Sequence, residues 1–244
     1  MDAAERVAEV LALVLERSPR ARDELDAGAV AILERHGLVA LTSGEVRPGP
    51  RLLRFARSGH DRRDLVALAE PPMRRLADES GETVNLMVSA ARGAEALSQV
   101  DGRHVLGVSS WIGREVPDHC SAAGKLFLAF GTSRLPDGPL ERRTPATIVD
   151  RDRLESELQT ARTRGFATIV DELETGLAAV AAPIRDADGA VVAALSVAGP
   201  TVRLTEHRLA LLGRVAIEQA HAVSTQLGYE GDLEDLLDPL RIRG

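Results

Sequence analysis

The sequence is poor in sulfur, in aromatic side chains and in lysine. Its 244 residues include one cysteine, Cys120, and one lysine, Lys125, and aromatic residues make up 2% of the chain. A single cysteine excludes an internal disulfide and a zinc site built on cysteines. With so few aromatic residues, the core has to be formed by leucine, valine, isoleucine and alanine.

Long apolar runs are also missing from the sequence. None approaches the length of a membrane span. The apolar run at residues 7–15 is interrupted by Glu9 and has no cleavage site after it, so we expect no signal peptide. These absences predict a soluble, cytoplasmic protein without membrane contact.

The charge balance is acidic, with a formal net charge of −7. This excludes a protein that coats nucleic acid over its whole surface, although it leaves room for a small DNA-binding module. Residues 1–60 hold nine arginines and nine acidic residues, so that part of the chain is close to neutral.

The most informative stretch is residues 106–130, LGVSSWIGREVPDHCSAAGKLFLAF. It reads as a short apolar strand, a turn at Gly113, an extended segment with Pro117, and an apolar helix over residues 125–130 opened by small residues at 121–124. A helix that begins with small residues exposes free backbone N–H groups, which suit a carboxylate. The alternative is a helix start that simply packs closely on a sheet.

The N-terminal segment predicts a reduced winged helix-turn-helix. Residues 3–17 are an amphipathic helix, residues 23–36 a second helix, and residues 38–47 a small hairpin. Only residues 18–36 are available for a support helix, a turn and a recognition helix, which is about ten residues too few. Residues 27–33, AGAVAIL, offer almost no side-chain hydrogen-bond donors for DNA.

The remaining chain alternates helices and strands, and the strands predominate. We expect linker helices at 51–57 and 61–80, the second kinked or broken at Pro71 and Pro72. Further helices are predicted at 120–130, 150–164 and 205–227. Strands are predicted at 82–89, 94–100, 104–109, 167–171, 177–185 and 190–198. Hairpin signals between several strands indicate an α+β fold with a mainly antiparallel sheet flanked by helices.

Four ordered blocks resemble the effector domain of the IclR family of bacterial transcriptional regulators. They are residues 106–130, GETVNLMV at 81–88, GFATIVDELETGLAAVAAPI at 165–184, and DADGAVVAALSVAGPTVRLT at 186–205. The segment HGLVALTSGEVRPGPRLLRFA resembles the wing and its exit in the same family. The resemblance implies a reduced winged helix-turn-helix at 1–50, a helical linker at 51–80, a GAF-like effector domain at 81–229 and an acidic tail at 230–244.

The resemblance also implies a cavity on one face of the effector sheet that binds a small organic acid. The matching effector-binding positions are Val105, Val108, Ser121, Ala122, Ala123, Gly124, Ile169, Ala179, Ser196 and Ala198. Several are apolar where relatives place Asp, Cys or Ser, which favours a larger, partly apolar or aromatic acid. Trp111 could be a lid, an interface residue or simple packing.

Catalytic and metal chemistry find little support in the sequence. His119 and Cys120 are adjacent and cannot face each other as base and nucleophile. The acids Asp171, Glu172 and Glu174 read as a solvated strand end. The six histidines show no ligand spacing, and no phosphate loop is present. We therefore expect no enzyme, no metal site and no cofactor.

The leading hypothesis is a ligand-responsive transcriptional regulator, either repressor or activator, that forms a homodimer or a dimer of dimers. Operator DNA would be contacted by the arginines Arg17, Arg20, Arg22 and Arg35. The alternative is a small-molecule sensor that has lost DNA binding and acts through protein partners. An enzyme acting on a small acid is a third, weaker interpretation. The sensor hypotheses require an unfilled hollow beneath the helix start at 121–124.

Overall fold

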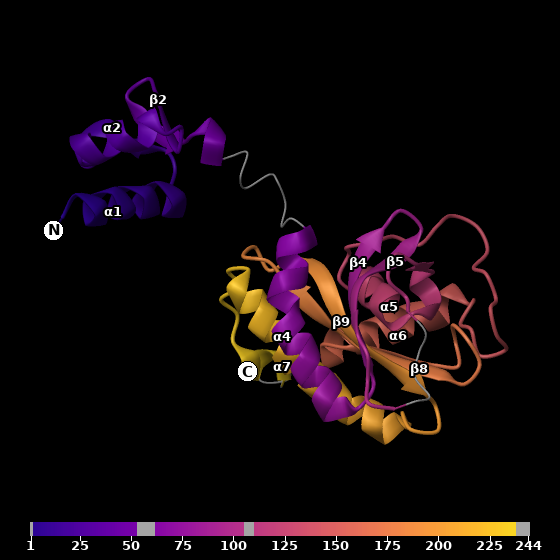
Figure 1. Ribbon diagram of the computed structural model, residues 1–244. Helices are drawn as coiled ribbons and strands as arrows, with labels where there is room; N and C mark the ends of the chain where they lie inside the picture. Colours follow the sequence, from indigo (N-terminus) through magenta and orange to yellow (C-terminus); the bar gives the residue numbers. More distant parts are fainter. Residues whose placement is uncertain (1, 53–61, 105–109, 238–244) are drawn as a thin grey trace. The chain divides into compact units, whose positions relative to one another are not determined.

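The computed structural model describes residues 2–52, 62–104 and 110–237, and the chain forms two compact units (Figure 1). One unit is Met1–Asp61 and the other is Arg62–Gly244. Each unit has its own hydrophobic core. Among the described residues, no helix combines the length and the apolar character that crossing a membrane requires.

Within its described residues, the N-terminal unit combines helices α1 and α2, one turn of 3₁₀-helix and a helical stretch at 50–52 with a sheet of order β1-β3-β2. The elements are α1 Ala3–Glu16, β1 Arg20–Ala21, η1 Arg22–Glu24, α2 Ala27–Arg35, β2 Val39–Thr42 and β3 Glu45–Pro48. The first helix starts at a capping box, because Asp2 and Glu5 each accept a hydrogen bond from the other's backbone N–H. The predicted hairpin is confirmed, with Ser43 and Gly44 at positive φ in its turn.

The predicted helix at 23–36 is wrong in its first part. Residues 22–24 form the single 3₁₀ turn η1, and α2 begins only after Asp26, whose side chain accepts a hydrogen bond from the N–H of Ala29. An aspartate that caps the next turn stops a helix from continuing backwards through it. No full support helix therefore stands between α1 and α2 in the described N-terminal unit.

The second unit is built on a six-stranded sheet in which all neighbouring strands run antiparallel, in the order β6-β5-β4-β9-β8-β7. The strands are β4 Thr83–Ala90, β5 Gly93–Val100, β6 Glu115–Val116, β7 Ala167–Val170, β8 Leu177–Arg185 and β9 Val191–Pro200. The α+β prediction with a mainly antiparallel sheet is confirmed. The predicted strand at 104–109 lies almost entirely outside the described residues.

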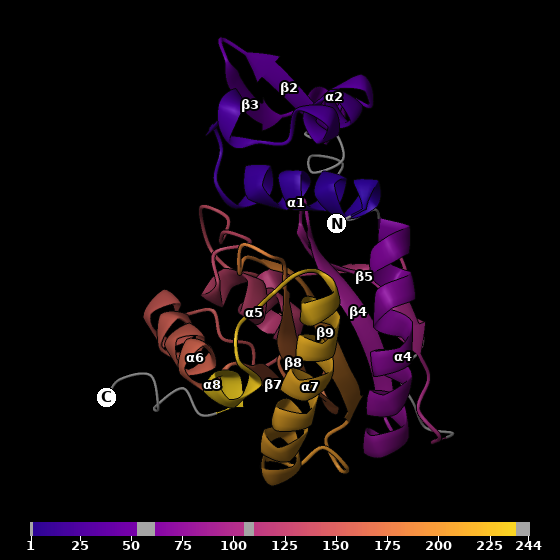
Figure 2. The ribbon, with the colours of Figure 1, turned by 90° about the vertical axis from the view of Figure 1, so that its left-hand side faces the viewer.

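Helices cover both faces of this sheet (Figure 2). They are α4 Arg62–Ser80, α5 Ala122–Ala129, α6 Arg151–Arg164, α7 Glu206–Gln226 and the short α8 Leu233–Leu237, with η2 Asp118–Cys120 directly before α5. The residues that α4 and α7 bury join one hydrophobic cluster with one face of the sheet. Those of α5 and α6 join a second cluster with the other face.

The linker helix is not broken at its two prolines, so the prediction of a new segment there is wrong, while the predicted kink stays a prediction. α4 continues without interruption through Pro71 and Pro72, and Pro72 is buried. The helix is fixed by apolar side chains on both sides of the prolines, including Leu65, Met73 and Leu76 in the core, so packing offsets the lost backbone hydrogen bonds. The predicted helix at 51–57 falls mainly on residues outside the described ranges.

A buried ion pair joins α5 to the connection between β7 and β8. The Lys125 Nζ atom donates a hydrogen bond of 2.6 Å to Glu172 Oε1, and the two side chains are 2% and 9% exposed. Glu172 was predicted to lie at a solvated strand end, and this is wrong, since the residue is buried. Burial raises the pKa of Glu172, and the nearby Lys125 ammonium opposes that rise.

Replacing Lys125 by methionine should lower the free energy of unfolding by roughly 3–5 kcal/mol at pH 8, because a buried carboxylate is left uncompensated. The loss should be smaller at pH 5 than at pH 8, because burial raises the pKa of Glu172 and the variant lacks the ammonium that opposes this rise, so the carboxylate takes up a proton more readily as pH falls. A carboxyl group whose pKa is higher in the folded than in the unfolded protein lowers the free energy of unfolding as pH rises through that pKa. Urea titrations at both pH values measure the difference.

The double variant K125M/E172L should recover most of this stability, since it removes both charges. The exposed i,i+4 pair Arg74–Glu70 provides the control, and Arg74→Met should cost less than about 0.5 kcal/mol. A K125M loss below about 1 kcal/mol at pH 8 would contradict a structural role for the pair.

Candidate functional site

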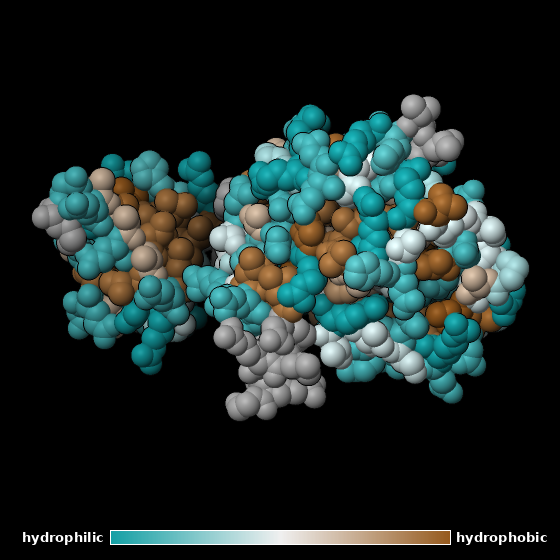
Figure 3. Space-filling model, turned by 90° about the horizontal axis from the view of Figure 1, so that it is seen from below, coloured by the Kyte–Doolittle hydropathy of each residue, from teal (hydrophilic) through white to brown (hydrophobic). Residues whose placement is uncertain are grey.

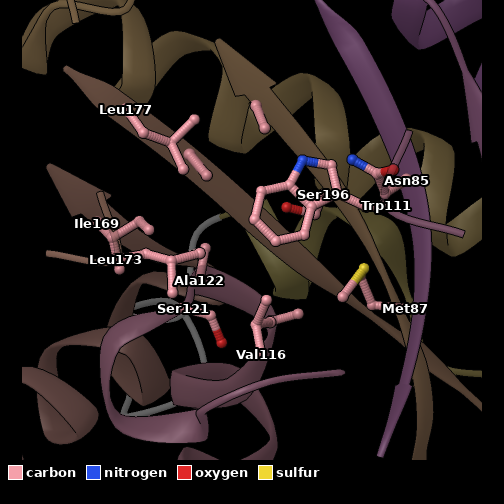
Figure 4. A pocket seen from close by; sticks show the side chains of 13 residues that line it. Asn85, Met87, Trp111, Val116, Ser121, Ala122, Ile169, Leu173, Leu177 and Ser196 are labelled. Carbon is pink, nitrogen blue, oxygen red and sulfur yellow. The ribbon is translucent and has the colours of Figure 1, made fainter. Parts of the chain in front are cut away.

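A hollow of about 50 Å³ lies between the start of α5 and the sheet (Figure 4). Its walls come from α5, from strands β4, β7, β8 and β9, and from the segments around Trp111 and Leu173. Most lining side chains are apolar, and the polar ones are few. A space of this size admits about four waters or a ligand core of similar size.

The structure brings together most of the predicted effector-binding residues. The seven that line the hollow are Ser121, Ala122, Ala123, Ile169, Ala179, Ser196 and Ala198. Gly124 is not among the lining residues. A side chain at Gly124 would overlap the backbone of Asp118, so this glycine permits close packing rather than ligand access. Val105 and Val108 lie outside the described residues. A binding role for these positions remains a prediction.

Six lining residues were not predicted as ligand contacts, namely Asn85, Met87, Trp111, Val116, Leu173 and Leu177. The alternation of β4 was a usable signal for Asn85 and Met87, because residues two apart on a strand face the same side. Trp111 was considered only as a lid, an interface residue or packing. The approach of Val116 and Leu173 depends on contacts between distant segments, which strand periodicity does not encode.

Ser121 shapes the start of α5. Its hydroxyl donates to the carbonyl oxygen of Pro117 at 2.8 Å and accepts from the N–H of Gly124 at 3.2 Å. The N–H groups of Ala122 and Ala123, in the first turn, have no acceptor within the helix. These two residues line the hollow, so the positive end of the helix dipole borders it.

The sheet contributes a polar pair to the opposite wall. Asn85 on β4 and Ser196 on β9 are direct partners in the antiparallel ladder, and both line the hollow. Asn85 is 4% exposed, and its Oδ1 atom is buried without a hydrogen-bond partner in the described part of the chain. Figure 4 shows Asn85 and Ser196 across the hollow from Ser121 and Ala122.

A wider groove of about 340 Å³ adjoins the hollow and shares Trp111, Val116 and Leu173 with it. Arg114 and Arg143 line this groove. The Arg114 guanidinium lies 5.9 Å from the centroid of the Trp111 ring, at cation–π distance. Trp111 therefore lies between an apolar inner space and an outer groove that carries two arginines and two glutamates, Glu115 and Glu174.

The groups weighed for catalysis are not arranged for it. Burial raises the pKa of Cys120 to about 12, so its thiol is not ionised at neutral pH. The His119 ring nitrogen Nε2 is 2.8 Å from the carbonyl oxygen of Glu141. Across residues 2–52, 62–104 and 110–237, no three His, Cys, Asp or Glu side chains are grouped to hold a metal ion.

The arginines predicted to contact DNA differ in their surroundings. Arg20 Nε donates to the carbonyl oxygen of Leu13 at 3.2 Å. Arg22 donates to the carbonyl oxygens of Leu25 and Ala27 at 3.4 and 3.3 Å. These guanidinium groups already stabilise the turns of the N-terminal unit, whereas Arg17 and Arg35 are exposed.

Comparisons of this chain with a family model and with curated proteins agree with one another. Residues 58–225 match the family model described as Bacterial transcriptional regulator IclR C-terminal. The HTH-type transcriptional repressor AllR of Escherichia coli (strain UTI89 / UPEC) is 36% identical over 177 residues, covering 70% of this chain and 65% of that protein. AllR of Klebsiella pneumoniae is 37% identical over 173 residues, covering 69% and 64%. The chain spans a little under two thirds of the length of these curated relatives.

Solved structures share the fold. A putative ICLR transcriptional regulator from Silicibacter sp. TM1040 has a TM-score of 0.71 at 22% identity, with 95% of this chain and 98% of that chain covered. The Agobacterium tumefaciens repressor BlcR has a TM-score of 0.66 at 24% identity, covering 94% and 98%. The C-terminal domain of the E. coli regulator KdgR has 0.58 at 30% identity, covering 68% and 99%.

The geometry at the start of α5 gives a pH-dependent prediction for Asp118. Its Oδ1 atom is buried without a partner among the described residues, and burial raises the pKa of Asp118 from 3.8 to about 6. The wild type should therefore lose stability as pH rises from about 4 to about 6. Asp118→Asn should be more stable than the wild type at pH 7.5, by up to the roughly 3 kcal/mol that a rise of about two pKa units represents, and equal to it near pH 4.

Urea unfolding midpoints of both proteins at pH 4 and pH 7.5 test this expectation. The control is Asp137→Asn, at an exposed position in the loop that follows α5. Its effect should stay within about 0.5 kcal/mol. An Asp118→Asn variant that is less stable than the wild type at pH 7.5 would contradict the prediction.

Proposed function

Because the chain belongs to the IclR family of bacterial transcriptional regulators, we propose that it is a ligand-responsive regulator acting in the cytoplasm. Its C-terminal domain, residues 81–229, binds a small organic acid. Binding favours one arrangement of a symmetric oligomer, which changes how the N-terminal domain, residues 1–50, meets operator DNA. Residues 51–80 link the two domains.

The observation that carries the ligand-binding proposal is the hollow beneath α5. A packed core leaves few spaces larger than a water molecule, so an apolar space with a helix start at its wall needs a reason. The N–H groups of Ala122 and Ala123 provide donors for a carboxylate, and the helix dipole favours its charge. The apolar remainder of the wall suits the body of the acid.

The size of the hollow bears on the kind of acid. A hollow of about 50 Å³ takes a compact acid by itself, whereas a larger, partly apolar or aromatic acid also needs space in the adjoining groove. The adjoining groove offers a route for a longer ligand to extend toward Arg114 and Arg143.

The N-terminal unit supports DNA contact through phosphates more than through bases. The exposed residues of α2 include Ala27, Gly28, Ala31 and Ile32, and Arg35 at the end of the helix is its only side-chain hydrogen-bond donor. Exposed arginines such as Arg17 and Arg35 are suited to phosphate oxygens. The scarcity of donors on α2 motivates the second candidate, a sensor without DNA contact that acts through protein partners.

An apolar face on the N-terminal unit supports oligomer formation. Figure 3 shows apolar residues gathered on this unit, where α1 leaves Leu15 56% exposed and Val7 and Leu11 half-buried. A second copy of the chain covering this face would give the two-fold symmetry that an inverted-repeat DNA site matches.

Thermal-shift screening against short aliphatic and aromatic acids tests ligand binding. At a ligand concentration 100 times Kd, stability should rise by about 2.7 kcal/mol, or roughly 5–10 °C in Tm. Ala179→Leu fills the hollow and should abolish the shift. Ala190→Leu, the same change at an exposed hairpin position, should keep it. A shift that survives Ala179→Leu would place the ligand elsewhere.

A gel shift with the DNA upstream of the protein's own gene tests the proposed binding to operator DNA. Binding should be retained at low salt and fall steeply as salt rises, because phosphate contacts release counterions. The double variant R17A/R35A should bind more weakly on every sequence. No shift at low salt, with the oligomer intact by light scattering, would favour the sensor without DNA contact.

A further inference from the structure

We infer that the ligand of the hollow carries a hydrogen-bond donor, a hydroxyl or an amide N–H, at the end opposite its carboxylate, and that Asn85 selects it. This inference rests on the proposed function, since it assigns a second recognition point within the same hollow. The first point is the start of α5, and the second is the pair Asn85 and Ser196 on the sheet.

The first argument is the state of the Asn85 side chain. Asn85 is 4% exposed, and its Oδ1 atom has no donor from any residue that the structure describes. A buried carbonyl oxygen without a hydrogen bond lowers the stability of the fold, so a purely structural role would be served better by an apolar residue. Asn85 is also the only asparagine among the 244 residues.

The second argument is the placement of the amide. Asn85 and Met87 lie on the face of β4 that lines the hollow, whereas Val84 and Leu86 lie in the cluster formed with α4 and α7. Asn85 stands directly opposite Ser196 on β9, and directly opposed side chains have Cβ atoms about 4.5–5.5 Å apart. The two polar groups therefore form one patch in an otherwise apolar wall.

The third argument concerns which ligand groups this patch accepts. The Asn85 side chain accepts through its Oδ1 atom and donates through its NH₂ group, and the Ser196 hydroxyl can do both. A ligand hydroxyl or amide N–H can satisfy the unpaired Oδ1, whereas a carboxylate or keto oxygen pairs only with the donors and leaves Oδ1 unsatisfied. No Lys, Arg or His is among the residues that line the hollow, so a second carboxylate buried there would lack a counter-ion. The patch thus selects hydroxy or amide acids over dicarboxylates and keto acids.

The test compares two acids of the same size, 3-hydroxypropionate and butyrate, which differ in a hydroxyl against a methyl group. Affinities can be followed through the fluorescence of Trp111, the only tryptophan in the chain and a lining residue. The wild type should bind 3-hydroxypropionate about tenfold more tightly than butyrate. Asn85→Leu should remove or reverse this preference.

Met87→Leu is the matched control, because it changes a neighbouring lining side chain on the same strand face without altering polarity. It should retain the tenfold preference. Selective ¹⁵N labelling of asparagine side chains adds a measurement that needs no variant, since one NH₂ group gives one pair of signals. That pair should shift with 3-hydroxypropionate much more than with butyrate.

The outcomes separate the two proposals. If both acids bind the wild type equally, or if Asn85→Leu keeps the preference while folded, the role of Asn85 is refuted and ligand binding stands. If the panel contains a binding acid but 3-hydroxypropionate and butyrate both fail, the assigned ligand class is wrong. If no acid in the panel binds, the proposed function fails, and this inference fails with it.

Discussion

The buried pair of Lys125 and Glu172 is the constraint on which the site depends. Removing either charge from water costs several kcal/mol. The 2.6 Å hydrogen bond from Lys125 Nζ to Glu172 Oε1 offsets this loss of hydration for both side chains. One partner lies in the first turn of α5, and the other lies in the connection that leaves β7. The pair therefore ties the start of α5 to the segment that follows the edge strand β7, and so fixes the position of the helix start relative to the sheet.

The hollow itself follows from side-chain size on a two-sided sheet. On the face toward α4 and α7, β8 and β9 present the larger residues Val180, Ile184, Leu195 and Val197 together with three alanines, Ala178, Ala182 and Ala193. On the other face the same strands present small residues such as Ala179, Ser196 and Ala198. Because side chains alternate between the two faces of each strand, the space on one face is filled and a gap remains on the other. Ala122 and Ala123 of α5, which face this gap, are also small.

Local patterns predicted most of the fold, because helix and strand periodicity and turn signals act over a few positions. The resemblance to the IclR family, carried over residue by residue, identified Ala122, Ala179 and Ser196, and only the small residues at 121–124 were also marked by a local pattern. The burial of Glu172 could not be predicted, because its partner lies 47 residues away and only the folded sheet brings them together. Asn85 was overlooked for a related reason, since its importance lies in a hydrogen bond that is absent within the described chain.

Strand β4 connects the ligand side of the sheet to the linker helix. Asn85 faces the hollow, while Leu86 packs in the cluster that contains Met73 and Leu76 of α4. A ligand shifts an equilibrium only by its difference in affinity for the two arrangements. One hydrogen bond to Asn85 supplies about 1 kcal/mol, whereas a change from 1:99 to 99:1 requires about 5.5 kcal/mol. If that hydrogen bond is the main difference between the arrangements, their free energies have to be nearly balanced before the ligand arrives.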